Sequence, residues 1–371
     1  MFGLPLTIPT LGIPLFFILF FFTFMIWLID FKSIKKYYNK ALLYFIFLGL
    51  FYVIISFCAG FSLIFDIPID KSFIIRQAYF LPFIGIAIPV FARSFNFGLF
   101  KYCLKMRLLF IIIAYFILNQ PALLYIAIIL FSIQNHLIGF FIFLTIFIFD
   151  GGFSSSLQAL LMQVILFIFF ISRIKINVKY LTLSILTLII SINYLSDDII
   201  NLIKLLGLYD SNASWRLMLW IDNIKSTIND TLFFGHGFGT SYFSAEGRQP
   251  GDFILSLAGG GAQTIREHGS RYIAEFVLGQ HNSFINIFYR LGIMGLLFFL
   301  AFFATIAKQI NIFSAPYQLN YVLIFSMLII GVNVGLESPD YSVLFVFLIG
   351  LVQYINFEYY KIKIHNYRFR Y

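Results

Sequence analysis

The stretch LGIPLFFILFFFTFMIWLID, residues 11–30, carries a single charged residue, the aspartate at its end. A helix of about 20 apolar residues is long enough to cross the hydrocarbon core of a bilayer. The run is continuous and does not alternate apolar with polar positions, so it predicts a helix and not a barrel strand. Similar runs recur at 41–60, 74–92, 157–172, 180–196, 285–307, 318–335 and 341–357.

The composition places the whole chain in the same class. Of its 371 residues, 61% are hydrophobic and 11% are charged, whereas soluble domains carry about 25% charged residues. We therefore predict an all-α, polytopic helical membrane protein with about eleven spans, within a range of about ten to twelve. Segment 108–149 fits either three short spans or two longer tilted helices, one of them kinked at Pro121.

The positive charges predict the orientation. They gather in short joints and in the C-terminal tail, which the positive-inside rule assigns to the cytoplasm. This places the N-terminus and segment 197–286 outside. We therefore divide the chain into an N-terminal transmembrane bundle (1–196), a large outer catalytic loop (197–286), and C-terminal transmembrane helices with a basic cytoplasmic tail (287–371). The net charge of +9 does not indicate nucleic-acid binding, because segment 197–286 has six basic and nine acidic residues, 6 − 9 = −3.

Segment 197–286 is the one long stretch that does not have the composition of membrane spans. It holds nine of the sixteen acidic residues and three of the five histidines: His236, His268 and His281. A membrane protein concentrates its chemistry where polar groups stay wet. We therefore expect the functional site here.

Helical periodicity from about Ser214 to Asn229 places Arg216 and Trp220 on one face, together with Asn223 and Thr227. A guanidinium binds phosphate in a bidentate manner, and an indole stacks on a sugar ring, so this face suits a phosphorylated sugar. The alternative is an interfacial helix whose Trp220 and Arg216 anchor at the headgroups.

The sequence GHGFG at 235–239 predicts a turn with positive φ and close backbone approach. It does not lie between a strand and a helix, so it is not a nucleotide-binding loop. His236 has no second ligand at a suitable spacing, so we predict no metal site. It is either a substrate contact or a plain loop histidine.

His281 and Asn282 open the span that follows the loop. A histidine at the mouth of a span suits a general base that takes a proton from a hydroxyl group. Asn282 begins a polar stripe with Asn286 and Tyr289, and Arg290 lies deeper. Asn282 and Arg290 are candidate substrate contacts. The stripe faces either a wet cavity or a capping and interface cluster.

Further charged residues are weaker candidates. Glu337, in the last outer joint, is a second candidate base or else a solvated carboxylate. Arg248, Arg266 and Arg271 suit binding of a charged sugar, or else pair with nearby glutamates on a solvated surface.

Four blocks in this order resemble the O-antigen ligase/polymerase superfamily of bacterial membrane glycosyltransferases. They are Trp215–Trp220, Leu232–Gly239, His281–Phe284, and Leu291–Phe298 with its glycines at 292 and 295. The resemblance covers about 215–350 by motif and rests on hydropathy before that. The joint at 150–156 departs from the pattern, because it lacks an arginine found there in many members.

The resemblance implies an undecaprenyl-diphosphate-linked oligosaccharide donor and a site on the periplasmic side of the bacterial inner membrane. Arg216 matches the arginine that contacts the pyrophosphate, and His281 matches the histidine that activates the acceptor hydroxyl. No cofactor or metal is implied. Membrane lipid is an expected partner, and a chain-length regulator is a further one.

Three activities fit these features. We favour a Wzy-type polymerase that joins oligosaccharide repeat units into O-antigen or capsular polysaccharide. An O-antigen ligase, which transfers the polymer onto the lipid A core, shares the donor and the motifs. A lipid-linked sugar transporter or flippase is disfavoured, because the spans contain few charges and no internal repeat.

Overall fold

The computed structural model describes part of the chain, including several apolar helices and the helix that precedes the GHGFG sequence. The described residues are 12–58, 69, 71–94, 180, 183–187, 189–192, 194–195, 198, 211–240, 282–312, 323, 326–327, 336 and 339–368. Nearly all of them are helical, and their single β-bridge pairs Ile69 with Thr240.

The helices follow the apolar runs of the sequence. They are α1 (Gly12–Ile29), α2 (Phe31–Ile34), η1 (Lys35–Tyr37), α3 (Lys40–Phe57), α5 (Lys71–Ala78), α6 (Phe80–Ser94), α13 (Ser211–Asn229), α17 (Ser283–Ile312) and α19 (Pro339–Arg368). The predicted spans at 41–60, 74–92 and 285–307 are confirmed as apolar helices long enough to cross a membrane: Lys40–Phe57, Phe73–Ser94 and Ser283–Gln309.

Other predicted elements agree in part. The run at 11–29 forms α1, and the helix predicted from about Ser214 to Asn229 forms α13. The run at 341–357 lies within α19, which continues through the predicted basic tail to Arg368. That tail contains neither proline nor glycine, so nothing in its sequence ends the helix. Segments 108–149 and 157–172 lie outside the described residues, and about eleven spans remains a prediction.

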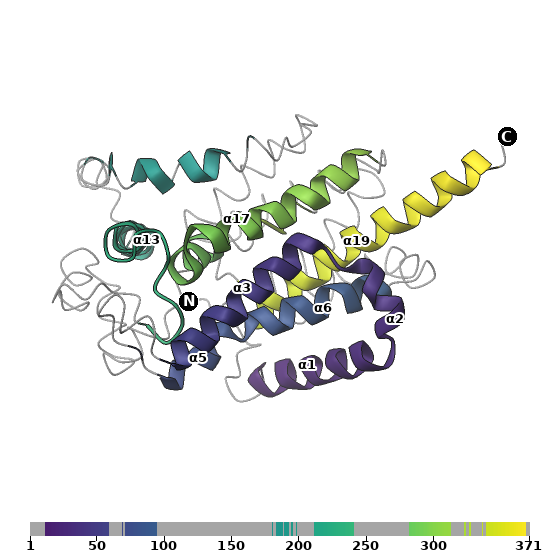
Figure 1. The fold of residues 1–371 in the computed structure, drawn as a ribbon, viewed down its shortest axis with the longest axis horizontal. Coiled ribbons are helices and arrows are strands. Elements are labelled where there is room, and N and C mark those ends of the chain that lie inside the picture. Colours follow the sequence, from purple (N-terminus) through teal and green to yellow (C-terminus); the bar gives the residue numbers. More distant parts are fainter. Residues whose placement is uncertain are drawn as a thin grey trace, which may run out of the picture.

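Four helices form the centre of the bundle. Helices α3, α6, α17 and α19 run along its long axis, and α1 packs on α6 (Figure 1). α13 is seen nearly end-on in this view and therefore lies across one end of the bundle (Figure 1). The predicted functional segment thus meets the bundle at its end, beside α17.

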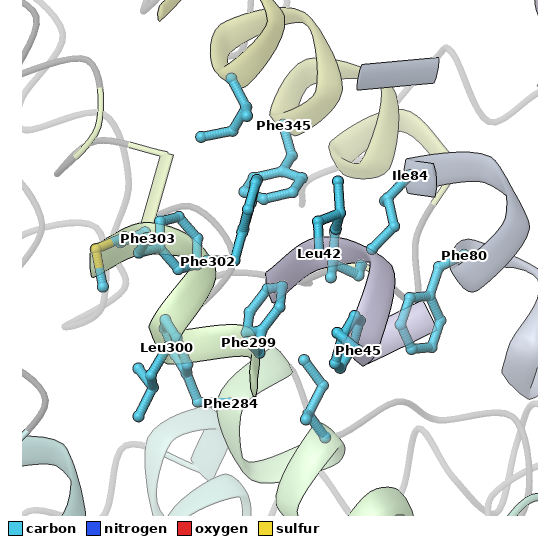
Figure 2. Packing of buried hydrophobic residues seen from close by; sticks show 14 of the residues in the cluster. Leu42, Phe45, Phe80, Ile84, Phe284, Phe299, Leu300, Phe302, Phe303 and Phe345 are labelled. Carbon is cyan, nitrogen blue, oxygen red and sulfur yellow. The ribbon is translucent and has the colours of Figure 1, made fainter. Parts of the chain in front are cut away.

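Phenylalanine side chains fill the space between these four helices (Figure 2). The ring centroids of Phe45 and Phe299 lie 5.0 Å apart, those of Phe299 and Phe303 lie 5.2 Å apart, and those of Phe303 and Phe345 lie 6.0 Å apart. Such tilted and edge-on pairs are the favoured arrangements of aromatic rings. Outward, α1 and α3 expose apolar side chains, as surfaces that face lipid do: Phe21, Phe22, Phe47, Phe51 and Ile54.

The two ends of the bundle differ in chemistry. At one end, Arg93 in the last turn of α6 pairs with Asp30 after α1 at 3.2 Å. Lys36 lies 4.7 Å from the ring centroid of Phe357 in α19. The basic joint at 32–40 and the approach to the basic tail therefore lie together. At the other end are Ser56, Gln77 and α13 (Figure 1).

Candidate functional site

Residues 235–239, the GHGFG loop, follow α13 after a short turn. Gly235, Gly237 and Gly239 have φ values of 86°, 75° and 81°. Only glycine adopts this left-handed region freely, because it has no Cβ. The predicted positive-φ turn is therefore confirmed.

The loop docks on a break in α17. Gly292 has φ 64° and ψ −164°, values that no helix contains. The break frees helix carbonyls, and the loop supplies their donors: the His236 N–H reaches the Tyr289 carbonyl at 2.7 Å, and the Gly237 N–H reaches the Arg290 carbonyl at 2.9 Å. The freed N–H of Ile293 donates to the Phe233 carbonyl at 2.9 Å. We call this contact between 233–240 and 289–293 the loop junction.

Two glycines make the loop junction sterically possible. A Cβ on Gly292 would lie 2.1 Å from the Phe233 carbonyl oxygen, and a Cβ on Gly235 would lie 2.4 Å from the Gly292 nitrogen. Both neighbours are backbone atoms, which cannot turn aside as the end of a side chain can. The two segments therefore meet backbone to backbone.

The Arg290 guanidinium anchors the loop from inside the bundle. It is 1% exposed, and its Nη1 donates to the carbonyls of Gly237 at 3.2 Å and Thr240 at 2.8 Å, and to the Thr240 hydroxyl. A buried cation requires such acceptors, since desolvation is costly. The sequence predicted a polar group facing the bundle interior here. The described contacts of Nη1 are with the protein's own loop.

His236 is 2% exposed and stacks on Tyr289, with ring centroids 4.2 Å apart. Ser226 Oγ donates to Asp230 Oδ2 at 2.6 Å and lies 2.9 Å from His236 Nε2. Because the serine proton points to Asp230, the imidazole must carry its proton on Nε2 and donate it to Ser226. His236 Nδ1 then holds a buried lone pair, with no hydrogen-bond partner among the described residues.

This Asp–Ser–His chain differs from a hydrolytic triad, in which the histidine stands between the other two residues. Burial and then the charge of Arg290 lower the pKa of His236 to about 3. A neutral imidazole of this kind is a weak proton acceptor. The geometry therefore supports a structural role for His236.

The early helices hold the far side of the loop. The N–H of Phe238 donates to Ser56 Oγ at 2.9 Å, and the N–H of Gly239 donates to Gln77 Oε1 at 2.6 Å. Gln77 Nε2 returns a bond to the Thr240 carbonyl at 3.2 Å. Helices α3, α5, α13 and α17 therefore all fix one short loop.

α13 presents its polar face to the protein. Asn223 and Thr227 are buried, and Trp220 is half-buried. Thr227 donates to the Asn223 carbonyl at 2.7 Å, while the amide atoms of Asn223 have no hydrogen-bond partner among the described residues. Arg216 lies in the second turn of the same helix, and its side chain lies outside the described atoms.

Asn282 begins α17 as its N-cap. Its Oδ1 accepts from the N–H groups of Phe284 at 3.0 Å and Ile285 at 3.2 Å, a bonding pattern that satisfies the first free donors of a helix. For Asn282, the capping alternative is therefore confirmed. Asn286, one turn on, is buried, and its Oδ1 has no partner among the described residues.

The last outer joint lies beside this helix start. The N–H of Leu336 donates to Ser283 Oγ at 2.7 Å, and its carbonyl accepts from Tyr79 at 3.1 Å and Ser342 at 2.7 Å. Leu336, next to Glu337, is therefore hydrogen-bonded to Ser283, two residues after His281. Five predicted residues lie outside the described part of the structure: His281, Glu337, Arg248, Arg266 and Arg271.

Sequence reasoning missed several residues of the loop junction. Gln77 and Ser56 come more than 150 residues before the loop they bind, and no local pattern connects them to it. Ser226 lies on α13 and Asp230 directly follows its last residue, so the two stand at i and i+4, a spacing that periodicity could have shown. Among the described residues, no group of three or more His, Cys, Asp or Glu is placed to hold a metal ion.

A scan of protein-family models found no match to this chain, and neither a curated protein nor a solved structure matches it.

Proposed function

We propose that this chain is a membrane glycosyltransferase of the Wzy polymerase type. It joins undecaprenyl-diphosphate-linked oligosaccharide repeat units at the bundle end that carries α13, the GHGFG loop and the start of α17. In this proposal the chain has about eleven spans and lies in a bacterial inner membrane, with this end facing the periplasm.

One observation carries the proposal: blocks distant in sequence converge at one place. Phe233 of the second block bonds to Ile293 of the fourth at 2.9 Å. Asn282 of the third block caps the same helix, α17, and α13, which bears the first block, packs against α17. The third and fourth blocks therefore lie at α17, the second is bonded to it, and the first lies on a helix that packs against it.

The proposed chemistry is a displacement at the anomeric carbon of the donor sugar. Arg216, on α13, binds the diphosphate, and His281, beside Asn282, takes the proton of the acceptor hydroxyl. The acceptor oxygen bonds to the anomeric carbon as the bond to the diphosphate oxygen breaks. A fixed guanidinium stabilises the departing charge without a metal, and Glu337 is the second candidate base.

The arrangement of charge supports the proposed orientation. The basic joint at 32–40 and the start of the basic tail share the end opposite the loop junction. Under the positive-inside rule that end is cytoplasmic, which leaves the loop junction on the periplasmic side.

The glycan profile of a gene deletion, complemented with wild type and with His281→Ala, tests this function. Lipid A core bearing one repeat unit in the deletion, restored to polymer by wild type only, supports the polymerase. Bare core with full polymer still on its lipid carrier identifies the ligase instead. Monomeric precursor that accumulates facing the cytoplasm identifies a transporter and overturns the proposal.

A further inference from the structure

Three apolar residues stand out at the loop junction, the LFF tip, Leu232–Phe234. Their exposed fractions are 69%, 40% and 61%. They follow the predicted outer helix and precede the buried GHGFG loop. If this part of the protein were surrounded by water, three large apolar side chains would be exposed to solvent. Contiguous exposed apolar groups of this size mark an interaction surface.

The tip backbone is held in an unfavourable shape. Leu232 and Phe233 have φ values of 49° and 70°, in the left-handed region that residues other than glycine rarely adopt. The same turn places the tip backbone in hydrogen bonds with Tyr52, Thr227 and Ile293. It leaves the three side chains exposed.

The backbone polar groups of Phe233 and Phe234 are nevertheless satisfied by protein. The N–H groups of Phe233 and Phe234 donate to the carbonyls of Thr227 at 3.0 Å and Thr231 at 2.9 Å. The Phe234 carbonyl accepts from the Tyr52 hydroxyl at 2.6 Å, and the Phe233 carbonyl accepts from Ile293. Non-helical backbone is tolerated at membrane depth only where it is buried in protein or lines a water-filled cavity, and these four backbone groups are bonded to protein.

The tip also lies beside the candidate membrane spans. Its bonds to Tyr52 and Ile293 place it against α3 and α17, whose outward residues there include Phe51, Ile54, Met294 and Leu297, all exposed. Tyr52 lies five residues before the end of α3, or about 8 Å at 1.5 Å per residue. That depth is within the hydrocarbon half-thickness of about 15 Å.

We propose that the LFF tip inserts into the hydrocarbon of the bilayer, continuing the lipid-facing surface of α3 and α17. The element from α13 to the GHGFG loop is then a re-entrant unit with its apolar tip in lipid and its polar loop in protein. This inference does not depend on the proposed chemistry, and it commits to bilayer acyl chains as the partner.

Site-directed spin labelling tests it with the full chain in phosphatidylcholine–phosphatidylglycerol vesicles that contain no isoprenoid lipid. Labels go to Leu232→Cys and Phe234→Cys in a Cys58→Ser, Cys103→Ser background. Phe47→Cys, exposed on α3, is the lipid control, and Asn229→Cys, exposed at the end of α13, is the water control. Collision rates are measured with oxygen and with a nickel chelate.

The expected result is a positive depth parameter at 232 and 234, as at 47, and a negative one at 229. Labels at 232 and 234 as accessible to nickel as the one at 229 would overturn the insertion. So would labels reached by neither reagent, since that pattern means another protein segment covers the tip. The readout needs no catalytic activity, so it stands apart from a failed glycan test.

Discussion

The phenylalanine core and the loop junction both involve α17, yet they are held together in opposite ways. Around Phe299, side chains from four helices fill the space (Figure 2), and none of the described residues of this cluster has a positive φ. Seven residues earlier, at Gly292, the backbone of α17 meets the backbone of Phe233, and a Cβ on Gly292 would lie 2.1 Å from the Phe233 carbonyl oxygen. The core depends on side chains that fill space, whereas the loop junction depends on glycines that have no side chain.

The difference indicates where the chain tolerates change. A core of flexible apolar side chains adjusts to a conservative replacement. The loop junction has no such freedom. Its main-chain hydrogen bonds require glycine at positions 235 and 292 and the guanidinium of Arg290. The following changes test that contrast, in order of expected effect.

Gly292→Ala should have the largest effect. The added methyl group would clash with the Phe233 carbonyl, and alanine would have to adopt a φ of 64°. We therefore expect a loss of at least about 4 kcal/mol of folding free energy. Gly85→Ala is the matched control, because its Cβ meets only the Cδ1 end of Ile46, at 2.5 Å. Thermal unfolding in detergent measures both, and equal loss in the two variants would contradict the contrast.

Arg290→Leu should come next. It removes the charge-assisted bonds from Nη1 to the Gly237 and Thr240 carbonyls. These carbonyls then keep only the longer bonds from the Thr240 hydroxyl at 3.3 Å and from Gln77 Nε2 at 3.2 Å, and we expect a cost of about 3 kcal/mol. The control is Arg93→Leu, whose ion pair with Asp30 is exposed and contributes about 1 kcal/mol or less. If thermal unfolding shows both arginine variants to be equally stable, Arg290 does not anchor the loop.

Acidification should destabilise the loop junction through His236. Its pKa is lowered to about 3 in the folded chain, while the unfolded chain titrates near its usual value of about 6.5. The unfolded state therefore binds the proton first, and stability falls as the pH drops below about 6.5. Between pH 6.5 and pH 5 we expect a loss of at most about 2 kcal/mol.

The matched variant is His236→Gln, which keeps a side-chain donor near Ser226 but does not titrate in this range. Its unfolding temperature should depend less on pH than that of the wild type. Parallel pH profiles for the two proteins would mean that His236 is not the group responsible.

Phe299→Leu should have the smallest effect, about 1 kcal/mol. Phe299 is fully buried among Phe45, Phe284 and Phe303, and a leucine keeps most of the apolar contact. If Phe299→Leu had a lower unfolding temperature than Gly292→Ala, the core, and not the loop junction, would be the part of the molecule that tolerates least change.

Much of this architecture follows from sequence because it is local. Apolar runs predicted three spans, periodicity predicted α13 to within three residues of its start at Ser211, and the glycine spacing predicted the turn. Each signal lies within the element that it forms.

The helix break at Gly292 was not predictable in the same way. The run 285–307 reads as one uninterrupted span, and the partner that satisfies its freed groups lies more than 50 residues earlier, at 233–237. For the same reason Arg290 looked like a substrate contact, whereas its described bonds hold the loop. A charged residue within an apolar run is visible in the sequence, but the groups that accept its hydrogen bonds are not.

The most direct test of the account is an assay of purified protein in vesicles with the lipid-linked repeat unit isolated from the deletion strain, in the presence of EDTA. The account predicts polymer and released polyprenyl diphosphate from the wild type, and neither from Arg216→Ala or His281→Ala. Intact lipid-linked donor that crosses the vesicle membrane without polymer or released diphosphate would contradict it.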